Sequence, residues 1–108
     1  MKLRQWEIWK ALPAGFGKPH WFVLLSNQER LDSQRHHAVN GLCCYTMRGQ
    51  LEPADVQLDA ADGLDTASAC QCDFIWVLEK GKLSHGRGMV SYERQQAIKS
   101  KLKERPRL

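Results

Sequence analysis

The chain has 108 residues, of which 43% are hydrophobic and 26% are charged, as in an ordinary globular domain that can bury a core. No apolar run approaches the roughly 18 residues that a membrane span needs. Trp6 and Glu7 directly follow Lys2 and Arg4, which leaves no apolar region of a signal peptide. We therefore expect one domain over residues 1–108, placed in the cytoplasm and outside any membrane.

The chain is basic, with a net charge of +4 and a pI of about 9.0. This charge modestly favours polyanionic partners, although it can equally serve solubility alone. Much of it gathers near the C-terminus, at Arg94, Lys99, Lys101, Lys103, Arg105 and Arg107. This basic cluster could steer nucleic acid or simply be solvated.

Residues 4–11 and 19–26 predict the first two strands, joined by a short loop that contains Gly15 and Gly17. The second segment is almost continuously apolar, which is typical of a strand buried on both faces. The glycines would let the loop backbone approach a ligand closely. The polar stretch at residues 27–37 predicts a loop with at most one helical turn.

The middle of the chain predicts four more strands, at residues 38–46, 54–59, 67–72 and 74–78. Gly41 marks a candidate bulge in the first of these. The segment 54–59 alternates apolar and polar residues, which indicates a half-buried strand. Asp62-Gly63 and residues 80–82 predict turns.

The last segment predicts a helix over residues 91–105. Ser91 suits the N-cap, and Ile98 and Leu102 stand four residues apart on a narrow apolar stripe. Pro106 would end the helix. The fold class is therefore mainly β: five to seven short strands in a bent antiparallel sheet or partly open barrel, with one C-terminal helix.

The four cysteines, Cys43, Cys44, Cys70 and Cys72, do not have the usual zinc spacing. On a strand, Cys43 and Cys44 would point to opposite faces, whereas Cys70 and Cys72 would share one. Disulfides are not expected in the cytoplasm. We predict small thiols packed in the core, with no metal and no cofactor.

Three segments, taken in order, resemble one known family. They are residues 7–9 (Glu-Ile-Trp), residues 18–27 (Lys-Pro-His-Trp-Phe-Val-Leu-Leu-Ser-Asn) and residues 73–83 (Asp-Phe-Ile-Trp-Val-Leu-Glu-Lys-Gly-Lys-Leu). They are similar to three segments of the MazF/PemK toxins of toxin–antitoxin systems, whose relatives include CcdB. Those family segments are the opening Gly-(Asp/Glu)-(Ile/Val)-(Trp/Tyr), the strand Arg-Pro-Val-Val-Val-Leu-Ser-Asn and the segment Asp-Gln-Ile-Arg-Thr-(Val/Ile)-Asp-Lys-x-(Arg/Lys)-Leu.

The resemblance implies a small SH3-like or CcdB-like barrel with a C-terminal helix, usually a homodimer. Most MazF-like members are metal-independent endoribonucleases that cut single-stranded RNA, and their antitoxins block the RNA groove. The resemblance therefore implies a toxin that needs no cofactor. Its partners would be single-stranded RNA, an antitoxin protein and a second copy of the chain.

Cutting RNA without a metal requires a proton acceptor for the ribose 2′-hydroxyl, a proton donor for the leaving oxygen and a cation at the phosphate. In the family, an Arg before Pro and a Thr or Ser at the end of the third strand act there, and these positions carry over to Lys18 and Thr46. Arg48, Gly15 and Gly17 would help to bind RNA. Lys18 and Arg48 can also be plain surface cations, and Thr46 can be an ordinary threonine at the end of a strand.

The chain departs from the family at two places. Lys18 supplies a point charge where the family's Arg offers a planar fork for two hydrogen bonds, so catalysis is expected to be weaker or altered. Phe74-Ile75-Trp76 replaces the family's Gln-Ile-Arg. These aromatic rings could stack bases, worth roughly 1–3 kcal/mol each, but packing in a core or a dimer interface is the favoured interpretation.

Three histidines complete the candidates. His20 lies two residues after Lys18, so strand alternation would place both on one face. It could supply acid–base chemistry there, although a hydrogen-bonded structural histidine is favoured. His36-His37 is expected to be solvated.

Three rival functions stay open. The first is a catalytically weakened or inactive RNA- or protein-binding module, which would keep the barrel. The second is a CcdB-like inhibitor of DNA gyrase; such proteins depend on the end of the C-terminal helix, and residues 101–106, basic and broken by proline, fit poorly. The third is a structural module, which would show no salt-dependent affinity for RNA.

Overall fold

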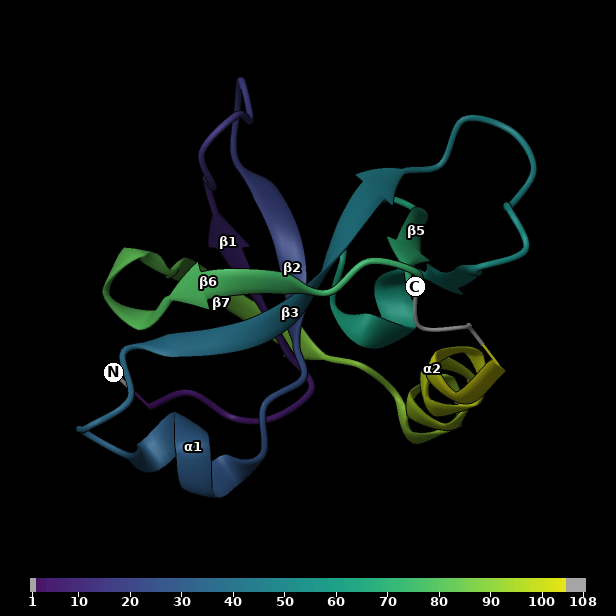
Figure 1. Ribbon diagram of the computed structural model, residues 1–108. Coiled ribbons are helices and arrows are strands. Elements are labelled where there is room, and N and C mark those ends of the chain that lie inside the picture. The colour runs from purple at the N-terminus through teal and green to yellow at the C-terminus, as the bar shows by residue number, and fades with distance from the viewer. Residues whose placement is uncertain (1, 105–108) are drawn as a thin grey trace.

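Seven strands form one antiparallel sheet in the computed structural model, which describes residues 2–104 (Figure 1). The elements are, in chain order, β1 (Glu7–Ala11), β2 (His20–Leu24), α1 (Gln28–Asp32), β3 (Ala38–Thr46), β4 (Asp55–Leu58), β5 (Ser68–Gln71), β6 (Trp76–Glu79), β7 (Ser84–Met89) and α2 (Tyr92–Glu104). The strand order β4-β5-β3-β2-β1-β7, with β6 also paired to β3, leaves the sheet open. The predicted mainly β class with a C-terminal helix is confirmed.

The long strand β3 organises the sheet. One edge pairs with β2, where Gly41 faces Leu24. The other edge is divided: the first half of β3 pairs with β6, and its last three residues pair with β5. Figure 1 shows β3 running from the α1 end of the molecule to the β5 end. A single strand thus links two parts of the sheet.

Gly41 pairs in regular register with Leu24 of β2 and with Trp76 of β6, so the bulge predicted at this residue is not seen. The glycine serves close packing instead. A Cβ there would lie 2.8 Å from Leu78 Cδ1 and 3.1 Å from the Val23 carbonyl oxygen. A larger residue would force the buried Leu78 side chain to move.

Both faces of the sheet are covered by buried side chains. The α2-side core holds Ile8, Val23, Leu42, Cys44, Val56, Leu58, Leu64, Cys70, Cys72, Val90 and Ile98. The α1-side core holds Leu3, Trp9, Ala11, Phe22, Leu24, Leu31, Val39, Cys43, Leu78 and Leu83. Strand β2 supplies Val23 to one core and Phe22 and Leu24 to the other, so its predicted burial on both faces is confirmed.

The cysteines follow the same alternation. Cys43 packs in the α1-side core, whereas Cys44, Cys70 and Cys72 pack in the α2-side core. All four are buried free thiols, as predicted. Burial raises the pKa of Cys43 to about 11, so its thiol stays protonated and unreactive. Among residues 2–104, no group of three or more His, Cys, Asp or Glu side chains is arranged to hold a metal ion.

Strand β7 is absent from the sequence-based prediction, which places the last strand at residues 74–78. Its sequence, Ser-His-Gly-Arg-Gly-Met, lacks the β-branched and aromatic residues that mark strands. Tertiary contacts decide here. Trp9 lies against Gly86, where a Cβ would come within 2.6 Å of the indole ring, so the glycine admits the ring and β7 pairs with β1.

The connections agree with their predictions in outline. Helix α1 is the single helical turn expected after β2, and the Asn27 side chain caps it by accepting a hydrogen bond from the Arg30 backbone. Asp62-Gly63 ends a short 3-10 turn, and residues 80–82 form another. Helix α2 begins directly after Ser91. The predicted stop at Pro106 and the basic residues Arg105 and Arg107 lie outside the described residues.

An ion-pair network ties α2 to the sheet. Arg94 Nη1 donates to Asp59 Oδ1 and to Asp62 Oδ2, each at 2.7 Å, and Nη2 donates to Asp59 Oδ2 at 3.1 Å. Asp62 is 1% exposed, and its second oxygen accepts from the Ser91 backbone N–H at 2.8 Å. The sequence position of Arg94 places it in the basic C-terminal cluster. In the structure, however, Arg94 is bonded to Asp59 and Asp62 and stabilises the fold. In residues 2–104, neither helix has the length and apolarity of a membrane span.

Candidate active site

A cavity of about 490 Å³ opens where β2 begins and β3 ends. It is lined by Lys10, Lys18, Pro19, His20, Trp21, Cys44, Tyr45, Thr46 and Arg48. Four of the predicted site residues, namely Lys18, His20, Thr46 and Arg48, therefore line one cavity. Lys18 and Thr46 come from separate segments, and both are exposed to solvent.

The register between β2 and β3 brings these residues together. The strands are antiparallel with Trp21 opposite Cys44, so the start of β2 lies beside the end of β3. Residues that precede β2 and residues that follow β3 then project from the same end of the sheet. Thr46 is also held by pairing with Ser68 of β5, so a strand fixes its position.

The charges in the cavity all have one sign. Lys10, Lys18 and Arg48 line it without any carboxylate, and none of the three forms an ion pair with another residue of the 2–104 range. Lys10 Nζ lies 4.9 Å from the centre of the Trp21 ring, a cation–π contact. Unpaired cations in a concave surface attract anions. Lys10 escapes the sequence-based prediction, because only the register of β1 against β2 places it beside Trp21.

His20 is hydrogen-bonded, as its structural interpretation predicts. Its Nδ1 lies 3.1 Å from the carbonyl oxygen of Lys18. A carbonyl only accepts, so Nδ1 carries the hydrogen, which leaves Nε2 as the acceptor whenever the ring is uncharged. The strand-alternation argument for His20 and Lys18 fails, since β2 begins at His20; the cavity brings the two residues together nonetheless.

Tyr45 is a cavity residue that the sequence-based prediction does not include. Its ring packs edge-on to His20, with 5.2 Å between ring centres. Burial, together with the neighbouring Cys43 thiol, raises the pKa of the Tyr45 hydroxyl to about 12, so it stays protonated near neutral pH. A protonated phenol can donate a hydrogen bond in the cavity. The sequence signal that could have identified Tyr45 is its position directly before Thr46 at the end of a strand.

The loop glycines lie apart from this cavity. Gly15 and Gly17 do not line it. Gly15 has φ of +93°, which disfavours any other residue, and both glycines face open space. Their predicted role in close approach to RNA stays a prediction.

The aromatic replacements divide between surface and core. Trp76 packs in part against the α1-side core, in line with the favoured interpretation. Phe74 is 54% exposed in this chain, and its ring contacts Trp76 with 4.8 Å between centres. A core role therefore holds for Trp76 and does not hold for Phe74.

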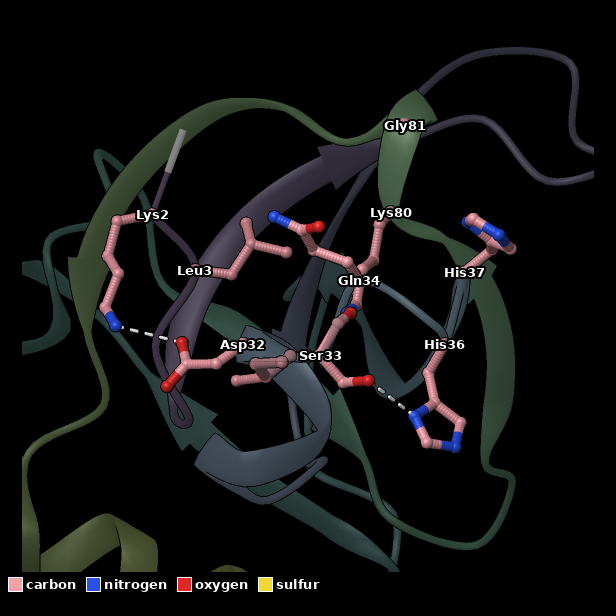
Figure 2. Close-up of a pocket in the computed structure, with 10 residues that line it drawn as sticks. Lys2, Leu3, Asp32, Ser33, Gln34, His36, His37, Lys80 and Gly81 are labelled. Atoms are coloured by element: carbon pink, nitrogen blue, oxygen red, sulfur yellow. Dashed lines mark hydrogen bonds and ion pairs between the residues drawn. The ribbon is translucent and has the colours of Figure 1, made fainter.

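A second cavity, of about 470 Å³, lies beside α1 and contains Lys2, His36, His37 and Lys80 (Figure 2). Its lysines are engaged by the protein itself. Lys2 Nζ pairs with Asp32 at 2.9 Å, and Lys80 Nζ donates to the carbonyl oxygens of Arg30 and Ser33 at 2.7 Å each. These bonds fasten the end of α1 to the turn after β6.

His36 and His37 are exposed, as predicted for solvated side chains. His36 Nδ1 lies 3.0 Å from Ser33 Oγ, and Figure 2 shows both imidazole rings on the loop that follows α1. The cavity beside α1 thus has fewer free cationic groups than the one at the start of β2. We take the latter as the candidate site.

The fold of this chain is similar to that of several proteins of known structure. No family model and no curated protein matches the chain at a significant level. Among solved structures, an endoribonuclease in complex with its cognate antitoxin from a mycobacterial species matches with a TM-score of 0.75 and 20% identity, over 99% of this chain and 98% of that one. A mycobacterial endoribonuclease matches with a TM-score of 0.74 and 20% identity, over 94% of this chain and 88% of that one.

The Mycobacterium tuberculosis toxin MazF-mt6 matches with a TM-score of 0.72 and 20% identity, over 89% of this chain and 91% of that one. At this level of identity, the likeness concerns the fold. The chain has the fold of these endoribonuclease toxins along nearly its whole length, as its three sequence segments predict.

Proposed function

We propose that this protein is a MazF-like toxin that cuts single-stranded RNA in the cytoplasm by metal-independent transesterification. One observation carries the proposal: Lys18, His20, Thr46 and Arg48 line a single cavity, although they come from separate β segments. Within residues 2–104, the cavity is lined by cations that form no ion pair and by no carboxylate, which suits a phosphate diester. The fold shared with solved endoribonuclease toxins supports the same function.

The residues suit the steps of the reaction. Lys18 and Arg48 would hold the scissile phosphate, and the Thr46 hydroxyl would donate to one of its oxygens. Nε2 of His20 would take the proton from the 2′-hydroxyl, whose oxygen then bonds to phosphorus. As the bond to the 5′ oxygen breaks, the protonated Tyr45 hydroxyl would give its proton to that leaving oxygen. Proton exchange with solvent would then return His20 and Tyr45 to their starting forms. The products are a cyclic phosphate and a free 5′-hydroxyl.

The proposal includes two protein partners. One solved structure with this fold is an endoribonuclease in complex with its cognate antitoxin. An antitoxin that covered the cavity of this chain would keep RNA out of it. A basic chain of net charge +4 suits an acidic antitoxin segment. A second copy of the chain, forming a homodimer, completes the proposed assembly.

The decisive experiment is incubation of the purified protein with a long unstructured RNA in EDTA, followed by mapping of the new ends. We expect discrete cuts with cyclic-phosphate and 5′-hydroxyl ends. Lys82→Ala is a control variant that should cut as the wild type does, because Lys82 is an exposed lysine that does not line the cavity and pairs with Glu79 at 3.7 Å. Intact RNA at high protein concentration, with the fold verified by circular dichroism, would overturn the nuclease proposal.

The second candidate function is an RNA-binding module without cleavage, and Lys18 favours it. A single ammonium group cannot reproduce the two parallel hydrogen bonds of a guanidinium. Lys18→Arg discriminates between the two functions. If the wild type is a nuclease, it should already cut, and Lys18→Arg should raise its rate modestly. If the wild type is a binding module, it should not cut RNA, whether or not Lys18→Arg creates cutting activity.

A further inference from the structure

A continuous row of aromatic rings leads away from the candidate site. The aromatic row consists of Phe74, Trp76, Phe16, His20 and Tyr45, in contact order. Successive ring centres lie 4.8, 4.9, 4.8 and 5.2 Å apart, and every contact is edge-on. Edge-on contact fixes the rings relative to one another. The row joins the start of β6, the β1–β2 loop and the cavity end of β2 and β3.

The two ends of the aromatic row differ in charge. At the Tyr45 end lies the cavity with its unpaired cations. At the Phe74 end lies a pocket of about 340 Å³, lined by Gln71, Asp73, Phe74 and Trp76. Among the described residues that line it, Asp73 alone is charged, and its carboxylate repels phosphate and can accept hydrogen bonds from amino groups. The first end therefore suits a phosphate, and the second suits a nucleobase.

Trp76 supplies a second, independent indication. Its indole Nε1 is buried without a hydrogen-bond partner among residues 2–104. Buried donors normally find an acceptor. Phe74 is an exposed ring that contacts this indole, so an acceptor that binds beside Phe74 would approach the Trp76 ring. Carbonyl oxygens and ring nitrogens of nucleobases are acceptors of this kind.

Val77, the aliphatic residue directly after Trp76, is oriented differently. Along β6, Trp76 and Leu78 pack on the α1-side core, whereas Val77 alternates to the other side and is 68% exposed. The aromatic surface is thus separate from the aliphatic surface of the same strand. A sequence-tolerant stacking platform needs flat aromatic faces, which Phe74 and Trp76 provide and Val77 does not.

We propose that Phe74 and Trp76 form a base-stacking subsite for single-stranded RNA. The aromatic row places it a few nucleotides from the phosphate bound in the cavity. This inference rests on the proposed function, because the phosphate anchored at the cavity directs the strand toward the subsite. Single-stranded RNA is favoured over a protein partner because the row is aromatic and continuous with the unpaired cations.

The test uses a fluorescent single-stranded RNA with 2′-O-methyl groups, which binds but cannot be cut because the attacking hydroxyl is blocked. We expect Phe74→Ala to weaken its binding roughly 5- to 150-fold, the range for loss of one stacked base. The dependence of affinity on salt should stay unchanged, because no phosphate contact is lost. Phe74→Tyr should retain affinity, and Val77→Ala, the matched control on the other side of β6, should bind as the wild type does.

A second probe locates the stacked base. The same oligonucleotide is prepared with one abasic site, moved along the strand in successive versions. The wild type should lose affinity when the abasic site reaches one position beyond the scissile phosphate. Phe74→Ala should show no loss at that position, because the partner ring is already gone.

The outcomes separate the two claims. If the wild type binds or cuts RNA, while Phe74→Ala matches it and no abasic position matters, the subsite is wrong and the proposed function stands. If the folded wild type neither binds nor cuts RNA, the proposed function fails, and the subsite fails with it. If Phe74→Ala changes the oligomeric state in light scattering without changing RNA affinity, the aromatic surface is a protein contact, and the subsite is rejected.

Discussion

Two regions of the molecule use cations in opposite ways. At the α2 anchor, Arg94 is matched by Asp59 and by the buried Asp62, and every charge there has a partner. In the cavity at the start of β2, the part of the chain that the structure describes places no carboxylate in the lining beside Lys18 and Arg48. A cation with a partner inside the protein holds the fold together, whereas a cluster of cations without one is available to an external anion. Local sequence does not distinguish the two kinds; the tertiary partners do.

The largest expected effect breaks the anchor. Arg94→Ala leaves the buried Asp62 carboxylate without its ion pair, and loss of one partner of a buried pair costs about 3–5 kcal/mol of unfolding free energy. Urea unfolding followed by circular dichroism measures this cost. Lys103→Ala, an exposed lysine on the same helix, is the control and should change stability very little. Equal stability of both variants would contradict the structural role of Arg94.

The next effect concerns the cavity. Lys18→Ala and Thr46→Ala should each lower RNA cleavage by roughly 100- to 1,000-fold, the usual loss when one group that stabilises transition-state charge is removed. Both side chains are exposed, so the urea midpoint should stay unchanged. Initial cleavage rates measured beside urea unfolding would check both halves of the expectation. If either variant lost both stability and activity, the cavity residue would stabilise the fold as Arg94 does at the anchor, which contradicts the expected difference between the two regions.

A third prediction addresses the strand that links the regions. Gly41→Ala places a methyl group 2.8 Å from Leu78 Cδ1, and overpacking of this kind costs about 1–3 kcal/mol. Unfolding free energy measures the cost. The cavity lies at the other end of β3, so the folded variant should retain its cleavage rate. Loss of cleavage without loss of stability would show that β6 positions the cavity.

The smallest effect is a pH dependence confined to the anchor. Hydrogen bonds from Arg94 lower the pKa of Asp59 to about 2, below its ordinary value of 3.8. A carboxylate with a lowered folded-state pKa contributes stability that is complete above its unfolded pKa and is lost as the pH falls through the folded pKa. The urea concentration at the unfolding midpoint should therefore decrease as the pH is lowered from about 4 to about 2. In Asp59→Asn this decline should be shallower; an identical decline would assign it to other carboxylates.

Much of the fold follows from local patterns. The apolar run of β2 and the alternation of β4 identify those strands, and the polar stretch before β3 contains the single turn of α1. Strand β7 does not follow from them, since its glycines and charges carry no strand signal. The Trp9 ring of β1 packs against Gly86 of β7, where there is no room for a side chain. The residue that favours glycine in β7 therefore lies in a strand distant in the chain.

The candidate site divides in the same way. Lys18 and Thr46 follow from motif resemblance, and the structure places both at one cavity. Lys10 and Tyr45 do not, because their positions depend on strand register, and Arg94 is misassigned because its acidic partners lie in a distant turn. The aromatic row crosses four chain segments, so no local window contains it.

The pairing of β2 with β3 has a consequence for how activity would be lost. The cavity is positioned by main-chain ladder bonds at the centre of the sheet, beside two buried cores, and no mobile lid is required to assemble it. Amide protons of Phe22 and Leu42 should then be among the slowest to exchange with deuterated solvent. Catalytic geometry would persist until the whole domain opens, so heat should abolish cleavage and far-ultraviolet dichroism at the same temperature.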